Sequence, residues 1–132
     1  MFNCQREDLT TAMTTGKLIT KHIFGISTRQ NCCFWRDEGH LFYVGGNNVV
    51  IVNAETKEQQ FIGGNTYPFM GLGITSLAHL HARRLIAVAE RSNDHGYITL
   101  YDSYTLKKKK TLSTDQFGSK EIIAMSFSHD GK

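Results

Sequence analysis

The chain has 132 residues, of which 40% are hydrophobic and 20% are charged, a composition typical of one folded domain and not of a disordered chain. Its formal net charge of +3 is too small to predict a nucleic-acid partner. The cysteines at positions 4, 32 and 33 suit neither a disulfide framework nor a zinc site, so we expect a reducing intracellular compartment. No apolar run has the length of a signal peptide or a membrane span, so we expect no membrane partner.

The first part of the chain carries no pattern of a stable element. Residues 1–21 mix charged side chains with several threonines. Between Glu7 and Leu18 this mixture predicts either a weak helical turn or disorder. We therefore expect an N-terminal arm over residues 1–21, followed by a region of repeated strands over residues 22–132.

The repeated unit is a series of short strands joined by turns. In the first copy, an alternating segment precedes two apolar runs, and a strand-like segment closes the copy; these parts lie at residues 30–35, 41–44, 48–52 and 58–62. Short apolar runs without proline favour strands that are buried on both faces. Gly45-Gly46-Asn47 lies between the two apolar runs and predicts a tight turn.

The second copy has the same order of parts. Its segments lie at residues 74–79, 85–89, 97–101 and 106–112, with a longer loop at 90–96. Leu41 and Leu85 are 44 positions apart, close to the roughly 40 to 45 residues of a four-stranded propeller blade. The two copies are therefore predicted to form two successive blades.

A third copy begins near the end of the sequence. Residues 122–127 repeat residues 74–79 at a spacing of 48, and Asp130 and Gly131 belong to a predicted turn after them. The copy stops at Lys132, in the middle of a hairpin. Because a blade buries its apolar faces only against neighbouring blades, we expect an incomplete ring, whose missing blades come either from a longer chain or from another subunit.

Two short strings connect these copies with a known repeat. Residues 98–102 and 127–132 resemble the WD40 signatures for the third strand of a blade and for the turn between its first two strands. Tyr101-Asp102 and Val52-Asn53 stand where that family usually has Trp-Asp. The predicted fold is therefore all-β, a WD40-type β-propeller fragment of about two and a half four-stranded blades, with blades at residues 22–65, 70–113 and 120–132.

A more specific resemblance comes from the strings at residues 61–64, 85–90, 98–102 and 120–128, and from Ile23-Phe24-Gly25-Ile26 near the start. Together they resemble the opening blades of the cilia- and flagella-associated protein 57 family, and related axonemal WD-repeat proteins share such blades. The resemblance implies a long protein with N-terminal propellers and a coiled coil, anchored on doublet microtubules and supporting inner dynein arms. It also implies cytoskeletal localisation in the cilium or flagellum, with other proteins as partners.

Two alternatives to this ciliary scaffold remain open. One is a general WD40 adaptor of the cytoplasm or nucleus that binds a peptide at the central channel. The other is RNA binding through Lys107–Lys110 with Tyr101 and Tyr104, which predicts a steep dependence of affinity on salt. The ciliary scaffold is the favoured hypothesis, and under it we expect no nucleic-acid partner.

Two groups of residues are candidate site residues. The run Lys107, Lys108, Lys109 and Lys110 falls on the outermost strand of the second blade. These lysines either contact an acidic partner, such as the surface of tubulin that the resemblance suggests, or protect an exposed strand from edge pairing. Asp102 is expected to hold the turn after the third strand by accepting backbone N–H groups.

No pattern in the sequence predicts catalysis. His79 and His81 would share one face of a strand, but no further ligand stands at metal-site spacing. Gly45-Gly46-Asn47-Asn48 and Gly63-Gly64-Asn65 lack the helix that a phosphate loop needs after them. Cys32 and Cys33 are expected in a buried strand, where thiols are inert. We therefore expect no enzyme activity, no metal, no cofactor and no small-molecule substrate.

Overall fold

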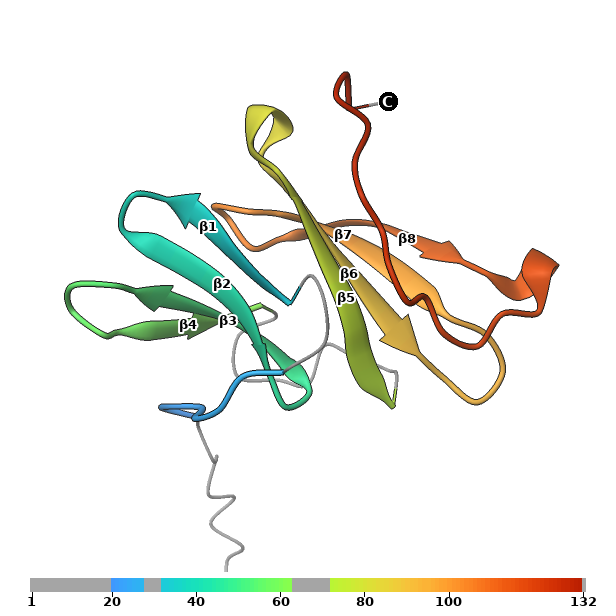
Figure 1. The fold of residues 1–132 in the computed structure, drawn as a ribbon, viewed down its shortest axis with the longest axis horizontal. Coiled ribbons are helices and arrows are strands. Elements are labelled where there is room, and N and C mark those ends of the chain that lie inside the picture. The colour runs from blue at the N-terminus through green and yellow to red at the C-terminus, as the bar shows by residue number, and fades with distance from the viewer. Residues whose placement is uncertain (1–19, 28–31, 63–71, 132) are drawn as a thin grey trace, which may run out of the picture.

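A computed structural model of the protein describes residues 20–27, 32–62 and 72–131. Within these ranges the chain forms eight β-strands in two four-stranded antiparallel sheets (Figure 1). The helical elements of this part of the chain are short 3₁₀ turns, at His81–Arg83 and Asp115–Phe117. The predicted all-β fold is confirmed, and the two sheets, which do not close on each other, are consistent with part of a WD40-like propeller.

The first sheet contains strands β1 to β4 in sequence order. Their bounds are Cys33–Asp37 (β1), His40–Gly45 (β2), Asn48–Asn53 (β3) and Gln59–Phe61 (β4). The predicted turn between the two apolar runs forms as expected, with Gly45 paired to Asn48 and Gly46 in the left-handed region at φ 59°. Glycine adopts that conformation without the steric cost of a Cβ. The hairpin register follows from this turn.

The second sheet repeats the same topology. Its strands are Gly73–Leu80 (β5), Leu85–Arg91 (β6), Tyr97–Asp102 (β7) and Lys108–Ser113 (β8). The loop between β6 and β7 is longer than the corresponding turn of the first sheet, as the sequence predicts. Strand β8 differs from its neighbours because all six of its residues are exposed.

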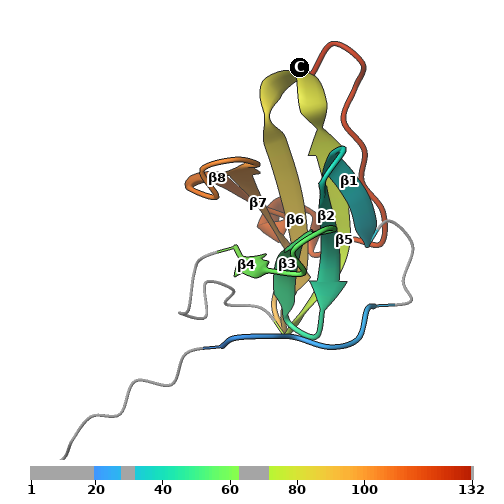
Figure 2. The same cartoon turned by 90° about the vertical axis from the view of Figure 1, so that its left-hand side faces the viewer.

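The core lies where one face of the first sheet packs against one face of the second (Figure 2). Alternate residues of the inner strands supply it, as the period of two along a strand requires. The first sheet contributes Phe42, Val44, Val49 and Ile51, and the second contributes Ile74, Leu77, Ile86, Val88 and Tyr101. Phe34 and Leu106 are partly buried against this cluster. The sheets therefore share one core.

The third copy of the repeat does not form the predicted strand. Residues 122–127 have no strand assignment, and the segment after β8 instead runs back across the second sheet (Figure 1). The Thr75 hydroxyl donates to the Ile122 carbonyl at 2.7 Å, and the Ser92 amide donates to the Lys120 carbonyl at 3.2 Å. A strand forms only with a partner strand, and the two sheets of the described residues include no strand from this segment.

Several expectations fall on residues that the structure does not describe. They include most of the N-terminal arm and the turn Gly63-Gly64-Asn65. The described segment at residues 20–27 contacts the first sheet, where the Tyr43 hydroxyl donates to the Ile23 carbonyl at 3.1 Å. No helix in the described ranges combines the length and the apolar composition that crossing a membrane requires.

Candidate interaction surface

The turn that follows the third strand of each sheet is built in the same way. In the second sheet, the Asp102 carboxylate accepts the backbone N–H groups of Tyr104 and Thr105 at 3.0 and 2.9 Å. In the first, the Asn53 side-chain oxygen accepts those of Glu55 and Thr56, both at 2.9 Å. A short side chain with an oxygen acceptor stabilises such a turn by taking up backbone N–H groups that have no strand partner.

The same turns contain a residue in the left-handed region that is not glycine. Leu106 has φ 57° in the second turn, and Lys57 has φ 62° in the first. Each turn is also fixed to the preceding hairpin by one backbone hydrogen bond: Ser103 donates to Arg84 at 2.9 Å, and Ala54 donates to Gly39 at 2.8 Å. The two turns are therefore equivalent in backbone and differ in side-chain charge.

The charge difference comes from the ion pair of Asp102. Its carboxylate lies 3.1 Å from the ammonium group of Lys109. The backbone N–H groups of Thr105 and Tyr104, together with Lys109, hold the pKa of Asp102 well below its usual range. Asp102 is therefore a charged turn acceptor, whereas Asn53 performs the same task without charge.

The four consecutive lysines do not all lie on β8. The strand begins at Lys108, so Lys107 belongs to the turn, where its carbonyl accepts the Asp102 amide at 2.9 Å. The register with β7 shifts between Leu100 and Tyr101, which pair with Lys110 and Lys108. Lys109 is the extra residue of this β-bulge, and its direction toward Asp102 follows from the local change in twist.

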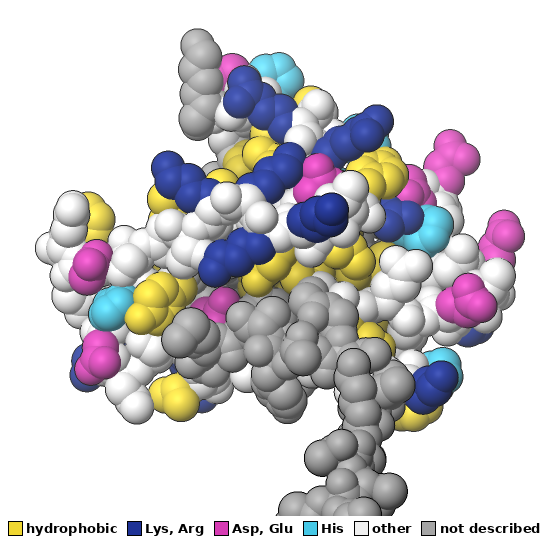
Figure 3. All heavy atoms as spheres, turned by 180° about the vertical axis from the view of Figure 1, so that it is seen from behind, with side chains coloured by type: hydrophobic (Ala, Val, Ile, Leu, Met, Phe, Trp, Pro, Cys, Tyr) yellow, Lys and Arg dark blue, Asp and Glu magenta, His cyan; other side chains and the backbone are white. Residues whose placement is uncertain are grey.

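A second basic group lies between the sheets. The guanidinium groups of Arg36, on β1, and Arg84, at the end of the 3₁₀ turn, lie 5.0 and 5.1 Å from the ring centroid of Tyr104. Both distances are within the range of cation–π attraction. Lys and Arg side chains gather over the rear of the molecule (Figure 3). Tyr104 thus connects the turn after β7 with both sheets.

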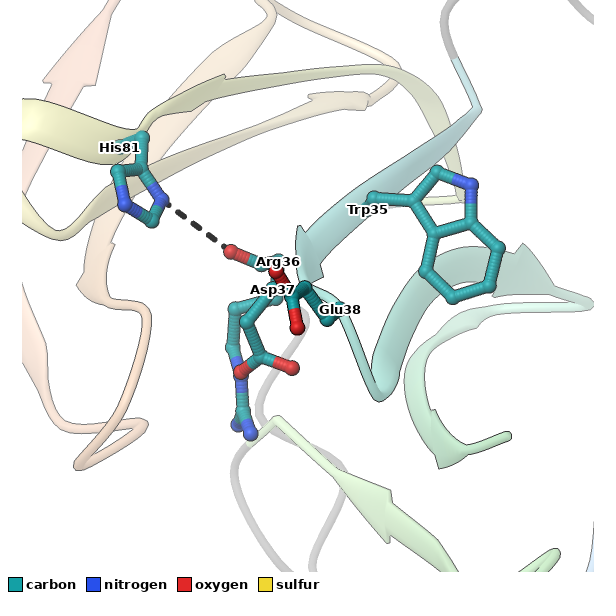
Figure 4. Close-up of a pocket in the computed structure, with 5 residues that line it drawn as sticks. All are labelled: Trp35, Arg36, Asp37, Glu38 and His81. Carbon is teal, nitrogen blue, oxygen red and sulfur yellow. Dashed lines mark hydrogen bonds and ion pairs between the residues drawn. The ribbon is translucent and has the colours of Figure 1, made fainter. Parts of the chain in front are cut away.

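An open hollow of about 540 Å³ is lined by five residues of this region (Figure 4): Trp35, Arg36, Asp37, Glu38 and His81. The Trp35 indole lies on one side and His81 on the other, and the His81 Nδ1 is 3.2 Å from the Arg36 carbonyl. Trp35 is 60% exposed. An exposed tryptophan beside charged groups is a common feature of binding surfaces.

Asp37 organises the charged side of this hollow. Its carboxylate accepts from the Arg36 Nε at 2.8 Å and from the Gly39 amide at 3.0 Å, and His40 Nδ1 lies 2.8 Å away. Burial acts to raise the pKa of Asp37, but the hydrogen bonds from Arg36, His40 and Gly39 outweigh it and hold the pKa well below its usual range. Asp37 thereby compensates the charge of Arg36.

His79 differs from its neighbour His81 in burial. Its ring contacts Phe42 edge-on at 5.6 Å and His81 at 6.0 Å. Burial lowers the pKa of His79, and the charges of His81 and Arg36 lower it further, against a hydrogen bond to the Trp35 backbone that raises it. The expectation that both histidines share a strand face is wrong, because β5 ends at Leu80 and His81 begins the 3₁₀ turn.

Other candidate residues lie apart from this surface. Asp130 and Gly131 form a turn in which the Gly131 amide donates to the Ser128 carbonyl at 2.9 Å. Cys32 is buried but Cys33 is exposed, so the expectation that both are buried is wrong for Cys33, which begins β1 on its exposed face. Tyr101, one of the aromatics considered for RNA stacking, is 3% exposed, so its ring is not accessible to a base.

The described residues contain no group of three His, Cys, Asp or Glu side chains arranged to hold a metal ion.

Sequence reasoning missed Arg36, Arg84 and Trp35. The signal for Arg84 was its place just before an apolar strand, in the turn of a hairpin. The signal for Trp35 was its alternation with Phe34 in a strand whose other face is buried. No signal in the sequence identifies Tyr104 as the meeting point of Arg36 and Arg84, because that contact joins two sheets.

The chain is similar in sequence to known proteins. Over 114 residues, 84% of this chain, the sequence is 31% identical to cilia- and flagella-associated protein 57 of Mus musculus. The chain is homologous to cilia- and flagella-associated protein 57. It is also 26% identical, over 113 residues, to cilia- and flagella-associated protein 57 C of Tetrahymena thermophila.

The homology is confined to a small part of these relatives. The chain spans 9% of the length of the mouse cilia- and flagella-associated protein 57 and 8% of that of the Tetrahymena protein. No protein-family model matches the chain. The resemblance inferred from the sequence is confirmed at the level of homology.

Proposed function

We propose that the chain is a WD-repeat interaction segment of a cilium- or flagellum-associated protein, and that it holds protein partners on the axoneme. The observation that carries this proposal is the 31% identity with the mouse cilia- and flagella-associated protein 57 over 84% of the chain. The role within the axoneme is that of a cytoskeletal scaffold which supports inner dynein arms and ciliary motility.

The architecture of the described residues supports a binding role. Two sheets that share a core present rigid turns at their ends, which is a suitable base for partner contacts. The exposed lysines of β8 and of its preceding turn supply positive charge for an acidic axonemal partner. The function that we propose resides in these surfaces.

The test is peptide mass spectrometry on detergent-washed axonemes of the source organism, separated in gel slices. Peptides of this chain recovered from the axonemal fraction, in a slice far above 14.9 kDa, would support a segment of a long axonemal scaffold. Peptides recovered only from the soluble cytosolic fraction would contradict the axonemal role. That result would favour a general WD40 adaptor.

A further inference from the structure

The strongest unassigned feature is the basic group around Tyr104, which we name the rim cluster. It consists of Arg36, Arg84, Tyr104, Lys107, Lys108 and Lys110. Two backbone hydrogen bonds join the elements that carry these residues: the Ser103 amide donates to the Arg84 carbonyl, and the Asp102 amide donates to the Lys107 carbonyl. One turn therefore connects the arginines to the lysines.

The positive charges of this cluster are unequally compensated. Arg36 is 8% exposed and paired with Asp37, and the neighbouring Lys109 is paired with Asp102. Among the residues that the structure describes, no carboxylate lies within ion-pair distance of Arg84 or of Lys107, Lys108 and Lys110. All four are exposed. Unpaired cations on one rim attract an anionic ligand.

Arg84 is held by contacts of both its backbone and its side chain. Its backbone is in the left-handed region at φ 52°, with its amide donating to the His81 carbonyl at 3.1 Å and its carbonyl accepting from Ser103 at 2.9 Å. Its guanidinium lies over the Tyr104 ring, which restricts its rotamers. A guanidinium held in this way can donate two parallel hydrogen bonds to a carboxylate with little loss of entropy.

The cluster fits an acidic polypeptide better than a nucleic acid. A base would need to stack on an aromatic ring, but the Tyr104 ring already carries two guanidinium groups and Tyr101 is buried. Carboxylates need no such platform. An extended acidic segment along the exposed edge strand β8 could meet lysines on both faces of the strand, because Lys108 and Lys110 pair with the adjacent residues Tyr101 and Leu100.

We propose that the rim cluster binds an extended acidic segment of a partner protein, with Arg84 as the main carboxylate ligand and Lys107, Lys108 and Lys110 as secondary contacts. This inference rests on the proposed function as a protein-interaction segment and names the class of partner. It also assigns the contact to the turn after β7 and to the hairpin turn before β6, and not to the lysine run alone.

The test is fluorescence anisotropy of a labelled polyglutamate peptide titrated with the 132-residue chain at low and physiological salt. Arg84→Gln should weaken binding by about tenfold, because one hydrogen-bonded ion pair is lost. Arg91→Gln removes the same charge from an exposed position at the other end of β6 and should leave the affinity within about twofold. Arg84→Lys should recover part of the loss, since it keeps charge without the fork.

Equal affinities for Arg84→Gln and Arg91→Gln would overturn the assignment to Arg84. Tighter binding of a labelled polyuridine RNA than of polyglutamate, or no binding of either, would overturn the acidic-segment proposal. Unchanged circular dichroism of each variant ensures that an affinity loss reports the contact and not unfolding. Recovery of the chain from axonemes is measured independently, so either proposal can fail while the other stands.

Discussion

The two sheets end their third strands with the same turn and fill the acceptor position differently. Asn53 and Asp102 accept two backbone N–H groups each at nearly equal distances. The second turn adds a negative charge, and the basic strand β8 follows it with Lys109 as the partner of Asp102. The comparison teaches that the backbone of the turn needs only an acceptor oxygen. The negative charge of Asp102 instead forms the ion pair with Lys109.

The largest expected effect comes from breaking the core that both sheets share. Phe42 is fully buried in the first sheet, and Phe42→Ala should cost about 3–5 kcal/mol of unfolding free energy through lost transfer energy and a cavity. Ile86→Ala, at the matching place in the second sheet, should cost about 2–5 kcal/mol. Urea denaturation of each variant measures both values.

Phe117 is the matched control for this experiment. It is 81% exposed, so Phe117→Ala should change the stability by no more than about 0.5 kcal/mol. A small effect of Phe42→Ala with a large effect of Ile86→Ala would mean that the second sheet folds without the first. Such a result would contradict a common core.

The next effect is the acid sensitivity that Asp102 adds to the second turn. Its pKa is lowered in the folded chain, so its stabilising contribution is present above the ordinary carboxyl pKa and is lost as the pH falls below it. Asp102→Asn keeps the turn acceptor, as Asn53 does, and should reduce the loss of thermal stability between neutral pH and pH of about 3. Melting temperatures measured across this range test the sign.

The reciprocal change sharpens the comparison. Asn53→Asp places a charge in the first turn, where the Lys57 ammonium group already donates to the Ala54 carbonyl. If Asn53→Asp and Asp102→Asn changed the acid sensitivity by the same amount and in the same direction, the two turns would not differ in the way described.

A smaller pH effect should come from His79. Its pKa is lowered by burial, by His81 and by Arg36, so the folded state favours the neutral ring. The stabilising contribution is therefore full above a pH of about 6.5 and declines as the pH falls below it. His79→Gln should remove this decline, whereas His95→Gln, on the β6–β7 loop, should retain it. Chemical denaturation at several pH values above and below about 6.5 measures the difference in unfolding free energy.

The smallest effect should come from the Lys109 ion pair. Lys109 is 45% exposed, and exposed pairs contribute about 0.2–1 kcal/mol, less at high salt. Lys109→Met should lower the melting temperature slightly at low ionic strength and leave it unchanged in concentrated salt. A loss that persists at high salt would show that packing of the lysine stem, and not charge, accounts for its role.

The strands and the hairpin turns could be predicted from local sequence. The apolar runs of β2, β3 and β6 and the turn at Gly45 and Gly46 depend on side-chain alternation and on glycine, both of which are visible in a short window. The third copy was predicted as a strand by the same reasoning, and residues 122–127 do not form one. A strand exists only with its partner, which no short window reveals.

The candidate site could be predicted only in part. The lysine run is evident in the sequence, and Asp102 stands at a position where turn acceptors are expected. The meeting of Arg36 and Arg84 on Tyr104 joins residues that are far apart along the chain, and it depends on how two sheets pack. The exposure of Cys33 also depends on which face of β1 meets the core.

Leu106 shows how the same backbone strain carries different constraints in the two sheets. A left-handed residue other than glycine costs roughly 1–2 kcal/mol, so replacement by glycine usually relieves strain at such a position. Lys57 is exposed, so a glycine there would relieve the strain and lose only the surface hydrogen bond from the Lys57 ammonium group to the Ala54 carbonyl. Leu106 packs against the shared core, and its replacement would exchange strain relief for a lost core contact. Replacement by glycine should therefore be tolerated better at Lys57 than at Leu106.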